Sequence, residues 1–189
     1  MKIQPLTIEG AFEVIPSPHH DARGIFVEWY RFDVLADAIG HPLSLAQANL
    51  STSARDVVRG IHFADVPPGQ AKYVTCATGA LLDVVVDLRV GSPTFGAWES
   101  TVLDDVDRRA VYLAEGLGHA FCALSDGATM AYLCSSTYRP GHEHGINPLD
   151  RELGITWPTD TPVLSAKDAV APTLAEARAA GLLPRYVGN

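Results

Sequence analysis

The part of the chain from residue 43 to residue 133 is a succession of short apolar segments separated by clusters of Gly, Pro and Asp. In the clearest segment, residues 81–89, every even position is aliphatic, whereas the odd positions include Asp83 and Asp87. Alternation with a period of two is typical of a half-buried β-strand. Many short strands joined by tight polar turns favour a sandwich or barrel of antiparallel strands.

The remaining elements are consistent with a mainly β protein. Strands are also predicted at residues 11–15, 25–30, 97–103, 109–113, 119–124 and 129–135. One early helix is predicted at residues 32–40, where apolar residues have helical spacing and Gly40 ends the run. A second helix is predicted at residues 173–180, before Gly181. No repeat or linker divides the chain, so we expect a single domain over residues 1–189.

Composition restricts the possible classes of function. The net charge of -8 argues against non-specific binding of nucleic acid, which requires a basic face. Cys76, Cys122 and Cys134 lie in apolar segments without CxxC spacing, which favours buried reduced thiols in a cytosolic protein. The N-terminus has no signal-peptide core, and no apolar run approaches the length of a membrane span. We therefore expect a cytoplasmic protein.

Residues 58–72 (VRGIHFADVPPGQAK) concentrate groups that could carry chemistry. Arg59 and His62 end a strand-like run, the Pro67-Pro68-Gly69 turn follows, and Lys72 opens the next strand. An antiparallel hairpin would place these three side chains side by side. Lysine is rare here, with three in the chain, and its desolvation requires a partner or a task. A surface hairpin with ordinary polar residues remains the alternative.

The other histidines differ in context. His62 and His119 lie in strand-like segments, where two hydrogen-bonded core residues remain an alternative to a site. His142 and His144 form an H-E-H motif, but it lies in a loop without an evident third ligand, so we do not expect a metal site. The histidines at positions 19, 20 and 41 lie beside prolines in turns and are expected to be solvated.

Two carboxylates have possible partners. Asp83 is predicted to pair with Lys72 across the sheet. Asp168 is predicted to orient a histidine by accepting its Nδ1–H, which would leave Nε2 as a base. The chain has neither a nucleophile elbow nor a glycine-rich phosphate loop. What remains is acid–base chemistry, with His as base, Lys and Arg for an oxyanion, and Tyr as proton donor.

The chain resembles the dTDP-4-dehydrorhamnose 3,5-epimerases, which are cupin-like jelly rolls. The motifs that carry the resemblance follow in family order: residues 21–28 (DARGIFVE), 47–49 (QAN), 58–63 (VRGIHF), 67–72 (PPGQAK), 83–89 (DVVVDLR), 91–98 (GSPTFGAW), 115–121 (EGLGHAF), 138–140 (YRP), 155–158 (ITWP) and 164–168 (LSAKD). No single motif is specific, but the set covers nearly the whole chain. Ala120 and Ala64 replace a common glycine and a frequent glutamine near the sugar pocket.

The resemblance implies a role for individual residues. It implies that His62 is the base, oriented by Asp168, that Lys72 stabilises an enolate oxygen, and that Tyr132 returns a proton. Tyr138 would stack on the thymine. Further contacts with the nucleotide sugar are implied for Arg23, Phe26, Glu28, Gln47, Asn49, Arg59, Lys72, His119, Glu143 and Lys167.

The implied activity is metal-free and cofactor-free epimerisation of dTDP-4-dehydro-6-deoxy-D-glucose at C3, C5 or both, in rhamnose or antibiotic deoxysugar biosynthesis, by a homodimer. Three alternatives stay open at this point. They are a 3-only or 5-only epimerase, a metal-dependent cupin, and a binding module without catalysis. Positive charge from Arg59 and Lys72 near His62 opposes a divalent cation.

Overall fold

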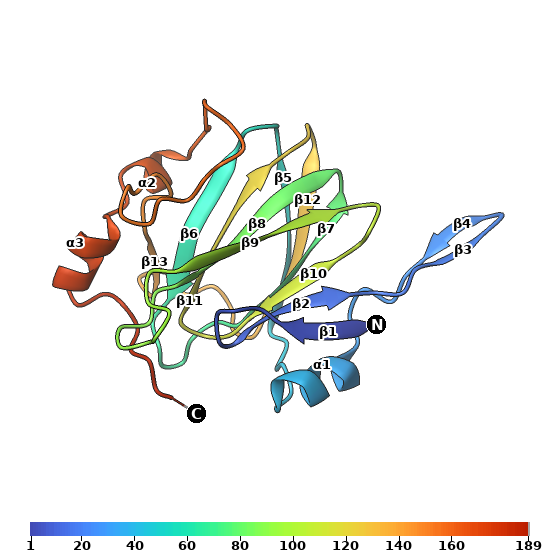
Figure 1. The fold of residues 1–189 in the computed structure, drawn as a ribbon, viewed down its shortest axis with the longest axis horizontal. Helices are drawn as coiled ribbons and strands as arrows, with labels where there is room; N and C mark the ends of the chain where they lie inside the picture. Colours follow the sequence, from blue (N-terminus) through green and yellow to red (C-terminus); the bar gives the residue numbers. More distant parts are fainter. Residues whose placement is uncertain (189) are drawn as a thin grey trace.

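Two antiparallel sheets that pack against each other form the body of the protein in this computed structural model, which describes residues 1–188 (Figure 1). One sheet has six strands in the order β1 (Lys2–Pro5), β2 (Ala11–Ile15), β10 (Ala110–Leu113), β7 (Lys72–Thr78), β12 (Ala128–Cys134) and β5 (Gln47–Ser53). The other has five, in the order β13 (Glu143–Gly145), β6 (Val58–Ala64), β11 (Leu117–Ala123), β8 (Ala80–Asp87) and β9 (Trp98–Asp104). The predicted class, a mainly β jelly roll of antiparallel strands, is confirmed.

Apolar side chains fill two spaces, one on each side of the five-stranded sheet. Between the sheets, Val74 and Met130 of the six-stranded sheet pack with Val85 and Phe121 of the five-stranded sheet. On its outer face, a second cluster packs Val84, Val86 and Phe63 beneath C-terminal residues such as Leu174 and Ala177. Strand β8 is consequently buried on both faces, and the prediction of a half-buried strand was wrong. Its two buried aspartates have polar partners, His119 for Asp83 and Arg89 for Asp87.

The helices follow their local signals. Helix α1 (Phe32–Ile39) ends at Gly40, whose left-handed conformation lets its N–H donate to the carbonyl of Ala36. Helix α3 (Leu174–Ala179) begins with a capping box between Thr173 and Glu176. Both predicted helices are confirmed. A third, α2 (Ala166–Ala169), was missed because it is only four residues long. Among residues 1–188, no helix has the length and apolarity needed to cross a membrane.

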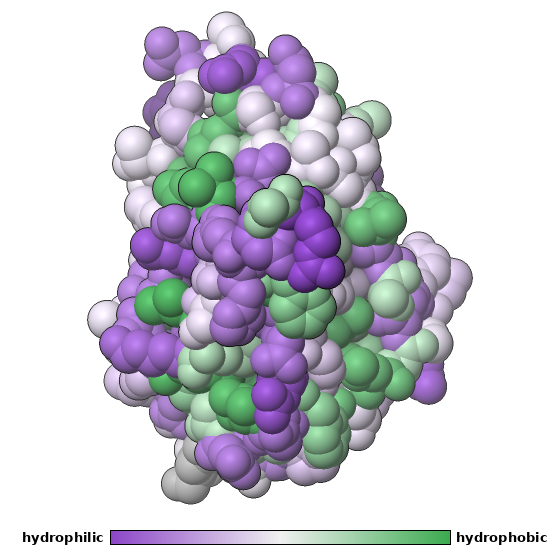
Figure 2. Space-filling model, turned by 90° about the vertical axis from the view of Figure 1, so that its right-hand side faces the viewer, coloured by the Kyte–Doolittle hydropathy of each residue, from purple (hydrophilic) through white to green (hydrophobic). Residues whose placement is uncertain are grey.

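A two-stranded ribbon of β3 (His19–Asp21) and β4 (Gly24–Phe26) projects from the body, at the right of Figure 1. The predicted strand at residues 25–30 was too long, since β4 ends at Phe26. Ile25 and Phe26 of the ribbon are exposed. Figure 2 views the molecule from this side, and hydrophilic and hydrophobic residues are interspersed across it.

The predicted hairpin of β6 and β7 was also wrong. The two strands follow each other in the chain, but they belong to different sheets. The turn at Pro67, Pro68 and Gly69 therefore crosses from one sheet to the other. His62 on β6 and Lys72 on β7 are not neighbours along one sheet, because they are carried by the two opposing sheets.

Candidate active site

His62 and Asp168 form a contact between β6 and the short helix α2. Nε2 of His62 lies 2.7 Å from Oδ1 of Asp168. Asp168 is buried, whereas the His62 side chain is 36% exposed and accessible to a ligand. The predicted contact is present, but through Nε2, so it is Nδ1 of His62 that remains free to act as a base.

Two further interactions set the charge and position of Asp168. Ser165 caps α2 by accepting the Asp168 N–H at 3.0 Å. Burial acts to raise the pKa of Asp168, but hydrogen bonds with His62 and Ser165 outweigh it, and the pKa lies below its ordinary value. An ionised carboxylate has no proton to donate, so it accepts the Nε2 hydrogen of His62 and selects one tautomer of the ring.

A bulge in β6 turns both Arg59 and His62 toward the side of the six-stranded sheet. A spacing of three would place two strand residues on opposite faces. Here His62 pairs with His119 while Arg59 pairs with Phe121, so β6 holds one extra residue against β11. Gly60 makes the bulge possible. Its φ is 114°, and a Cβ at this position would clash with the Ala120 Cβ, only 2.6 Å away.

The six-stranded sheet supplies the opposite wall. Cys134 of β12 pairs with Lys72 on one side and with Gln47 of β5 on the other. Two residues earlier on β12, Tyr132 pairs with Asn49. Residues opposite each other or two apart share a face, so these five side chains all face the five-stranded sheet. Tyr132 packs against the cluster between the two sheets.

Burial controls the charges on this wall. Burial lowers the pKa of Lys72, while nearby Cys134, Glu143 and Asp83 act in the opposite direction. Burial also raises the pKa of Tyr132, and the nearby Cys134 and Glu143 raise it further. Tyr132 is thereby kept protonated and able to donate, whereas burial disfavours the charged form of Lys72 and the three neighbouring groups favour it.

His119 and Asp83 form a second contact, inside the five-stranded sheet. Nε2 of His119 lies 2.6 Å from Oδ1 of Asp83, and both side chains are buried. The prediction that Asp83 pairs with Lys72 across one sheet was wrong, because the two residues belong to different sheets. Asp83 still acts electrostatically on Lys72. Within residues 1–188 its Oδ2 is buried without a hydrogen-bond partner.

Other predicted contact residues are held by hydrogen bonds at the edges of the two walls. Arg59 Nε donates to Ser53 at 3.1 Å. Gln47 accepts the backbone N–H of Tyr138 at 2.8 Å, and Tyr138 remains 57% exposed. Lys167 is exposed on α2, next to Asp168.

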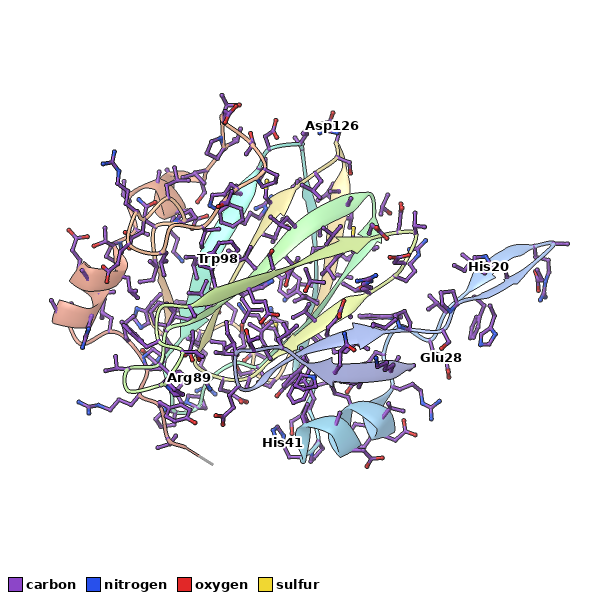
Figure 3. All side chains as sticks on the ribbon, in the orientation of Figure 1. His20, Glu28, His41, Arg89, Trp98 and Asp126 are labelled. Carbon is purple, nitrogen blue, oxygen red and sulfur yellow. The ribbon has the colours of Figure 1, made fainter. Side chains whose placement is uncertain are left out.

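Three predicted contact residues lie away from this assembly. Arg23 and Phe26 belong to the projecting ribbon, and Glu28 lies near its base (Figure 3). In Figure 1 the ribbon points away from β6 and α2. Arg23 is exposed and paired with Asp21 of the same ribbon. The fold of one chain therefore does not bring these residues to His62.

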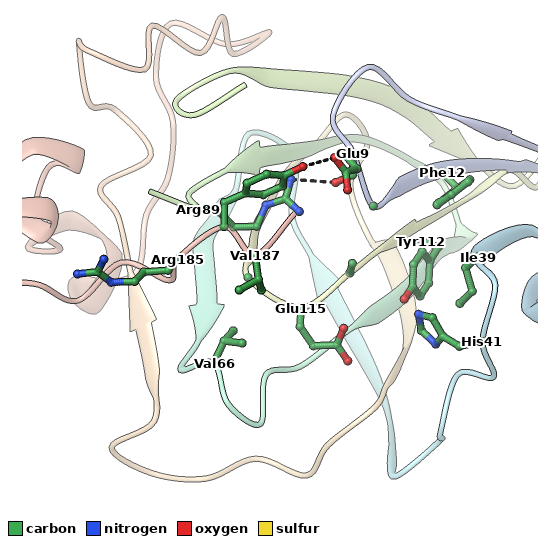
Figure 4. A pocket seen from close by; sticks show the side chains of 14 residues that line it. Glu9, Phe12, Ile39, His41, Val66, Arg89, Tyr112, Glu115, Arg185 and Val187 are labelled. Carbon is green, nitrogen blue, oxygen red and sulfur yellow. Dashed lines mark hydrogen bonds between the residues drawn. The ribbon is translucent and has the colours of Figure 1, made fainter. Parts of the chain in front are cut away.

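A cavity of about 370 Å³ lies elsewhere, between the C-terminal residues, β10 and α1 (Figure 4). It is lined by residues that include Glu9, His41, Arg89, Tyr112 and Tyr186. None of the predicted catalytic or substrate-contacting residues lines it. Among residues 1–188, no group of three or more His, Cys, Asp or Glu side chains is arranged to hold a metal ion.

The fold is a cupin-like jelly roll of antiparallel strands that carries His62 on one sheet and Lys72 and Tyr132 on the other. The sequence profile of the family described as dTDP-4-dehydrorhamnose 3,5-epimerase matches residues 5–176. The chain belongs to this family, whose members are dTDP-sugar epimerases and hence isomerases.

Individual relatives are similar over nearly their whole length. The dTDP-4-dehydrorhamnose 3-epimerase of Streptomyces niveus is 66% identical over 98% of this chain and 90% of its own. The crystal structure of a 4-keto-6-deoxy sugar epimerase from the novobiocin biosynthetic gene cluster of Streptomyces spheroides is 66% identical, covers 98% of this chain and 94% of its own, and has a TM-score of 0.97. A 3'-monoepimerase from Streptomyces bikiniensis, solved in complex with dTDP-quinovose, is 54% identical with a TM-score of 0.94, and covers 96% and 92% of the two chains.

Proposed function

We propose that this protein epimerises dTDP-4-dehydro-6-deoxy-D-glucose at C3, C5 or both, without a metal or another cofactor. The observation that carries the proposal is the placement of His62 on one sheet and of Lys72 and Tyr132 on the other, all facing the space between. Epimerisation requires a proton to leave one face of the sugar ring and another to arrive on the opposite face. Two opposing walls with complementary groups meet this requirement.

In the proposed mechanism, Nδ1 of His62 removes the proton from the carbon next to the C4 ketone. The electrons of the broken C–H bond form the enolate, whose oxygen is stabilised by the ammonium of Lys72, a type of interaction worth about 3–4 kcal/mol. Asp168 holds the His62 ring and stabilises its charged form. The hydroxyl of Tyr132 then donates a proton to the opposite face of the carbon, and solvent restores both residues.

The nucleotide end of the ligand is assigned to polar groups at the rim. A relative solved with dTDP-quinovose supports a dTDP-linked sugar as the ligand. Arg59, whose Nε donates to Ser53, would meet a phosphate, and the exposed Tyr138 would stack on a base. Stacking of this kind is worth about 1–3 kcal/mol.

The projecting ribbon supports a homodimer as the working unit. Arg23 and Phe26 carry predicted substrate contacts but lie far from the site of their own chain (Figure 1). An exposed ribbon that carries apolar residues is suited to packing on a second copy. We propose that the ribbon of one subunit reaches the site of the other. A single domain over residues 1–189 and a cytoplasmic location remain predictions.

Incubation with dTDP-4-dehydro-6-deoxy-D-glucose in D2O containing EDTA tests the activity directly. Solvent deuterium should enter the sugar at C3 and C5, or at one of them, as followed by NMR. His62→Asn should bind dTDP but lose the exchange by a factor of about 10²–10⁴, the usual contribution of a general base. Binding of dTDP without any exchange in the wild type would refute catalysis, and exchange abolished by EDTA would favour a metal-dependent cupin.

The same spectra separate a mono-epimerase from a 3,5-epimerase. The 66% identical relative is named as a 3-epimerase, which favours reaction at C3 as the second candidate. Deuterium at C3 alone would establish it. Deuterium at both carbons would establish the 3,5-epimerase.

A mixing experiment tests the shared site. His62→Asn and the double variant Arg23→Ala/Phe26→Ala should each be inactive as homodimers. After subunit exchange, a mixed dimer contains one site with an intact His62 and an intact ribbon, so activity should reappear. Persistent inactivity of mixed dimers, or a monomeric mass in solution, would refute the exchange.

A further inference from the structure

Asp65, the residue that follows β6, joins this strand to the edge strand β13. Its Oδ1 lies 2.6 Å from Nε2 of His144, and its Oδ2 lies 3.1 Å from Nδ1 of His142. The backbone N–H of Asp65 also donates to the carbonyl of His142 at 3.0 Å. One residue therefore binds the positions on both sides of Glu143, and we name these three side chains, Asp65, His142 and His144, the clamp.

The strand that the clamp holds is short. β13 has three residues, lies at the edge of its sheet and pairs with β6, with Glu143 opposite Ala64 and Gly145 opposite His62. A three-residue edge strand has few hydrogen bonds of its own and opens readily. Successive strand residues point to opposite faces. His142 and His144 therefore share the face of Asp65, and Glu143 points the other way.

Glu143 lies beside the acid–base groups. Its charge opposes the effect of burial on the pKa of Lys72 and adds to the increase in the pKa of Tyr132. The other ionisable groups that act on Lys72 are Cys134 and Asp83. Moving Glu143 away would leave Lys72 with less negative charge nearby, so a smaller fraction of it would be protonated.

We propose that Asp65 is a positioning residue for the epimerase reaction, which acts through the clamp to hold Glu143 beside Lys72. The inference rests on the proposed function and adds a residue outside its acid–base set. The hydrogen bond from His144 helps keep the pKa of Asp65 below its ordinary value, so the carboxylate is ionised at neutral pH. Each histidine can donate a ring N–H whether it is neutral or charged, so the clamp persists through the working pH range.

Three variants separate the clamp from general stability. Asp65→Ala removes both contacts with the histidines. Asp65→Asn keeps both contacts, because the amide can accept a hydrogen bond from one ring and donate one to the other. Asp160→Ala removes an exposed carboxylate from a loop and serves as the matched control.

We expect Asp65→Ala to lower kcat about tenfold, the size of a 1.4 kcal/mol change, with a smaller change in KM. The alkaline limb of its pH–rate profile should move to lower pH, since Lys72 loses support for its charged form. Asp65→Asn should show a smaller change in both quantities, and Asp160→Ala should match the wild type. Asp65→Ala indistinguishable from Asp160→Ala would overturn the proposal, and thermal melting of each variant checks that it folds.

A double-mutant cycle with Glu143→Gln tests the route of the effect. If Asp65 acts through Glu143, Asp65→Ala should lower kcat less than about twofold in the Glu143→Gln background. An undiminished tenfold loss there would show another route and overturn the assignment.

Amide hydrogen exchange tests the clamp without reference to activity. Asp65→Ala should speed exchange at Ile146, whose N–H donates to the carbonyl of Ile61 on β6, whereas Asp65→Asn should do so less. Unchanged exchange would refute the clamp even in an active enzyme. Absence of deuterium uptake by the sugar in the wild type would instead refute the proposed function, so the two failures are distinguishable.

Discussion

Asp83 and Asp87 lie four residues apart on the same face of β8, and both are buried, but their surroundings differ. Asp87 accepts hydrogen bonds at both oxygens, with Arg89 at 2.9 Å on each and with Ser92 and Thr94 on Oδ2. Asp83 contacts His119 through Oδ1, and its Oδ2 is a buried acceptor without a partner among residues 1–188.

The two aspartates of one strand are therefore hydrogen-bonded to different degrees. Buried polar groups in native proteins are nearly always paired, so an exception requires an explanation. The hydrogen bonds of Asp87 hold Arg89. Arg89 in turn donates to the carbonyl of Glu9, and its Cζ lies 5.2 Å from the centre of the Tyr186 ring (Figure 4). These contacts attach the C-terminal residues to the sheet. Asp83, by contrast, contacts His119 and acts electrostatically on Lys72 of the opposite sheet.

The largest expected effect is a loss of stability when Asp87 is replaced. Asp87→Asn should destabilise the protein by about 3–5 kcal/mol, because it leaves the guanidinium of Arg89 buried without its counter-charge. The activity of the molecules that remain folded should stay within about twofold of the wild type. Urea unfolding and kcat per folded molecule measure the two effects. A change in stability below about 1 kcal/mol would erase the contrast with Asp83.

A comparable loss of stability is expected at the bulge. Gly60→Ala places a Cβ 2.6 Å from the Ala120 Cβ at a φ of 114°, which should destabilise the fold by about 1–3 kcal/mol for the clash and a similar amount for the backbone. Gly91→Ala, with a φ of 96° and open space around the Cβ, is the matched control for backbone strain alone. Equal losses in the two variants, measured by urea unfolding, would show that the close approach has no effect.

Replacement of Asp83 should affect the kinetics of the reaction. Asp83→Asn should lower kcat about 10- to 100-fold, because it removes a charge that supports Lys72 and replaces the carboxylate that accepts from His119 with a neutral amide. The free energy of unfolding should change by less than in Asp87→Asn. Steady-state kinetics and urea unfolding on both variants provide the comparison. If Asp83→Asn is the less stable of the two and is fully active, the functional assignment of Asp83 is wrong.

The smallest expected effect is the position of the alkaline limb. Burial lowers the pKa of Lys72 below 10.5, so the ammonium, and with it kcat, should be lost at a pH below that value. In this range the unfolded chain binds more protons at Lys72, so stability should rise with pH while activity falls. Arginine stays protonated, so any residual activity of Lys72→Arg should lack the limb. A limb at the same pH in both proteins would assign it to another group.

Many of the elements could be predicted from the sequence. The helix that ends at Gly40 and the helix that begins at Thr173 depend on local hydrogen bonds, and both are present. The strand runs were located to within a few residues, because alternation is also a local property. Helix α2 was missed, since its four residues contain only the Ser165 cap as a signal.

The site was predicted less completely. Contact between Asp168 and His62, 106 residues apart, was expected, but the nitrogen that makes it was not. Arg59 and His62 share a face only because of the bulge at Gly60, and a spacing of three gives no indication of one. The contacts of Asp65 with His142 and His144 could not be predicted, because the H-E-H motif by itself indicates only a metal site.

The sequence by itself determined the positions of most turns, the alternating strands, and the few residue types available for acid–base chemistry. These depend on backbone conformation and hydrophobic periodicity, which act over a few residues. Tertiary structure decided that β6 and β7 lie in opposite sheets, that Asp83 contacts His119, and that the ribbon of β3 and β4 leaves the body. Strand pairing is chosen by the burial of residues distant in the chain. The opposition of His62 to Lys72 and Tyr132 therefore arises only when both sheets enclose one core.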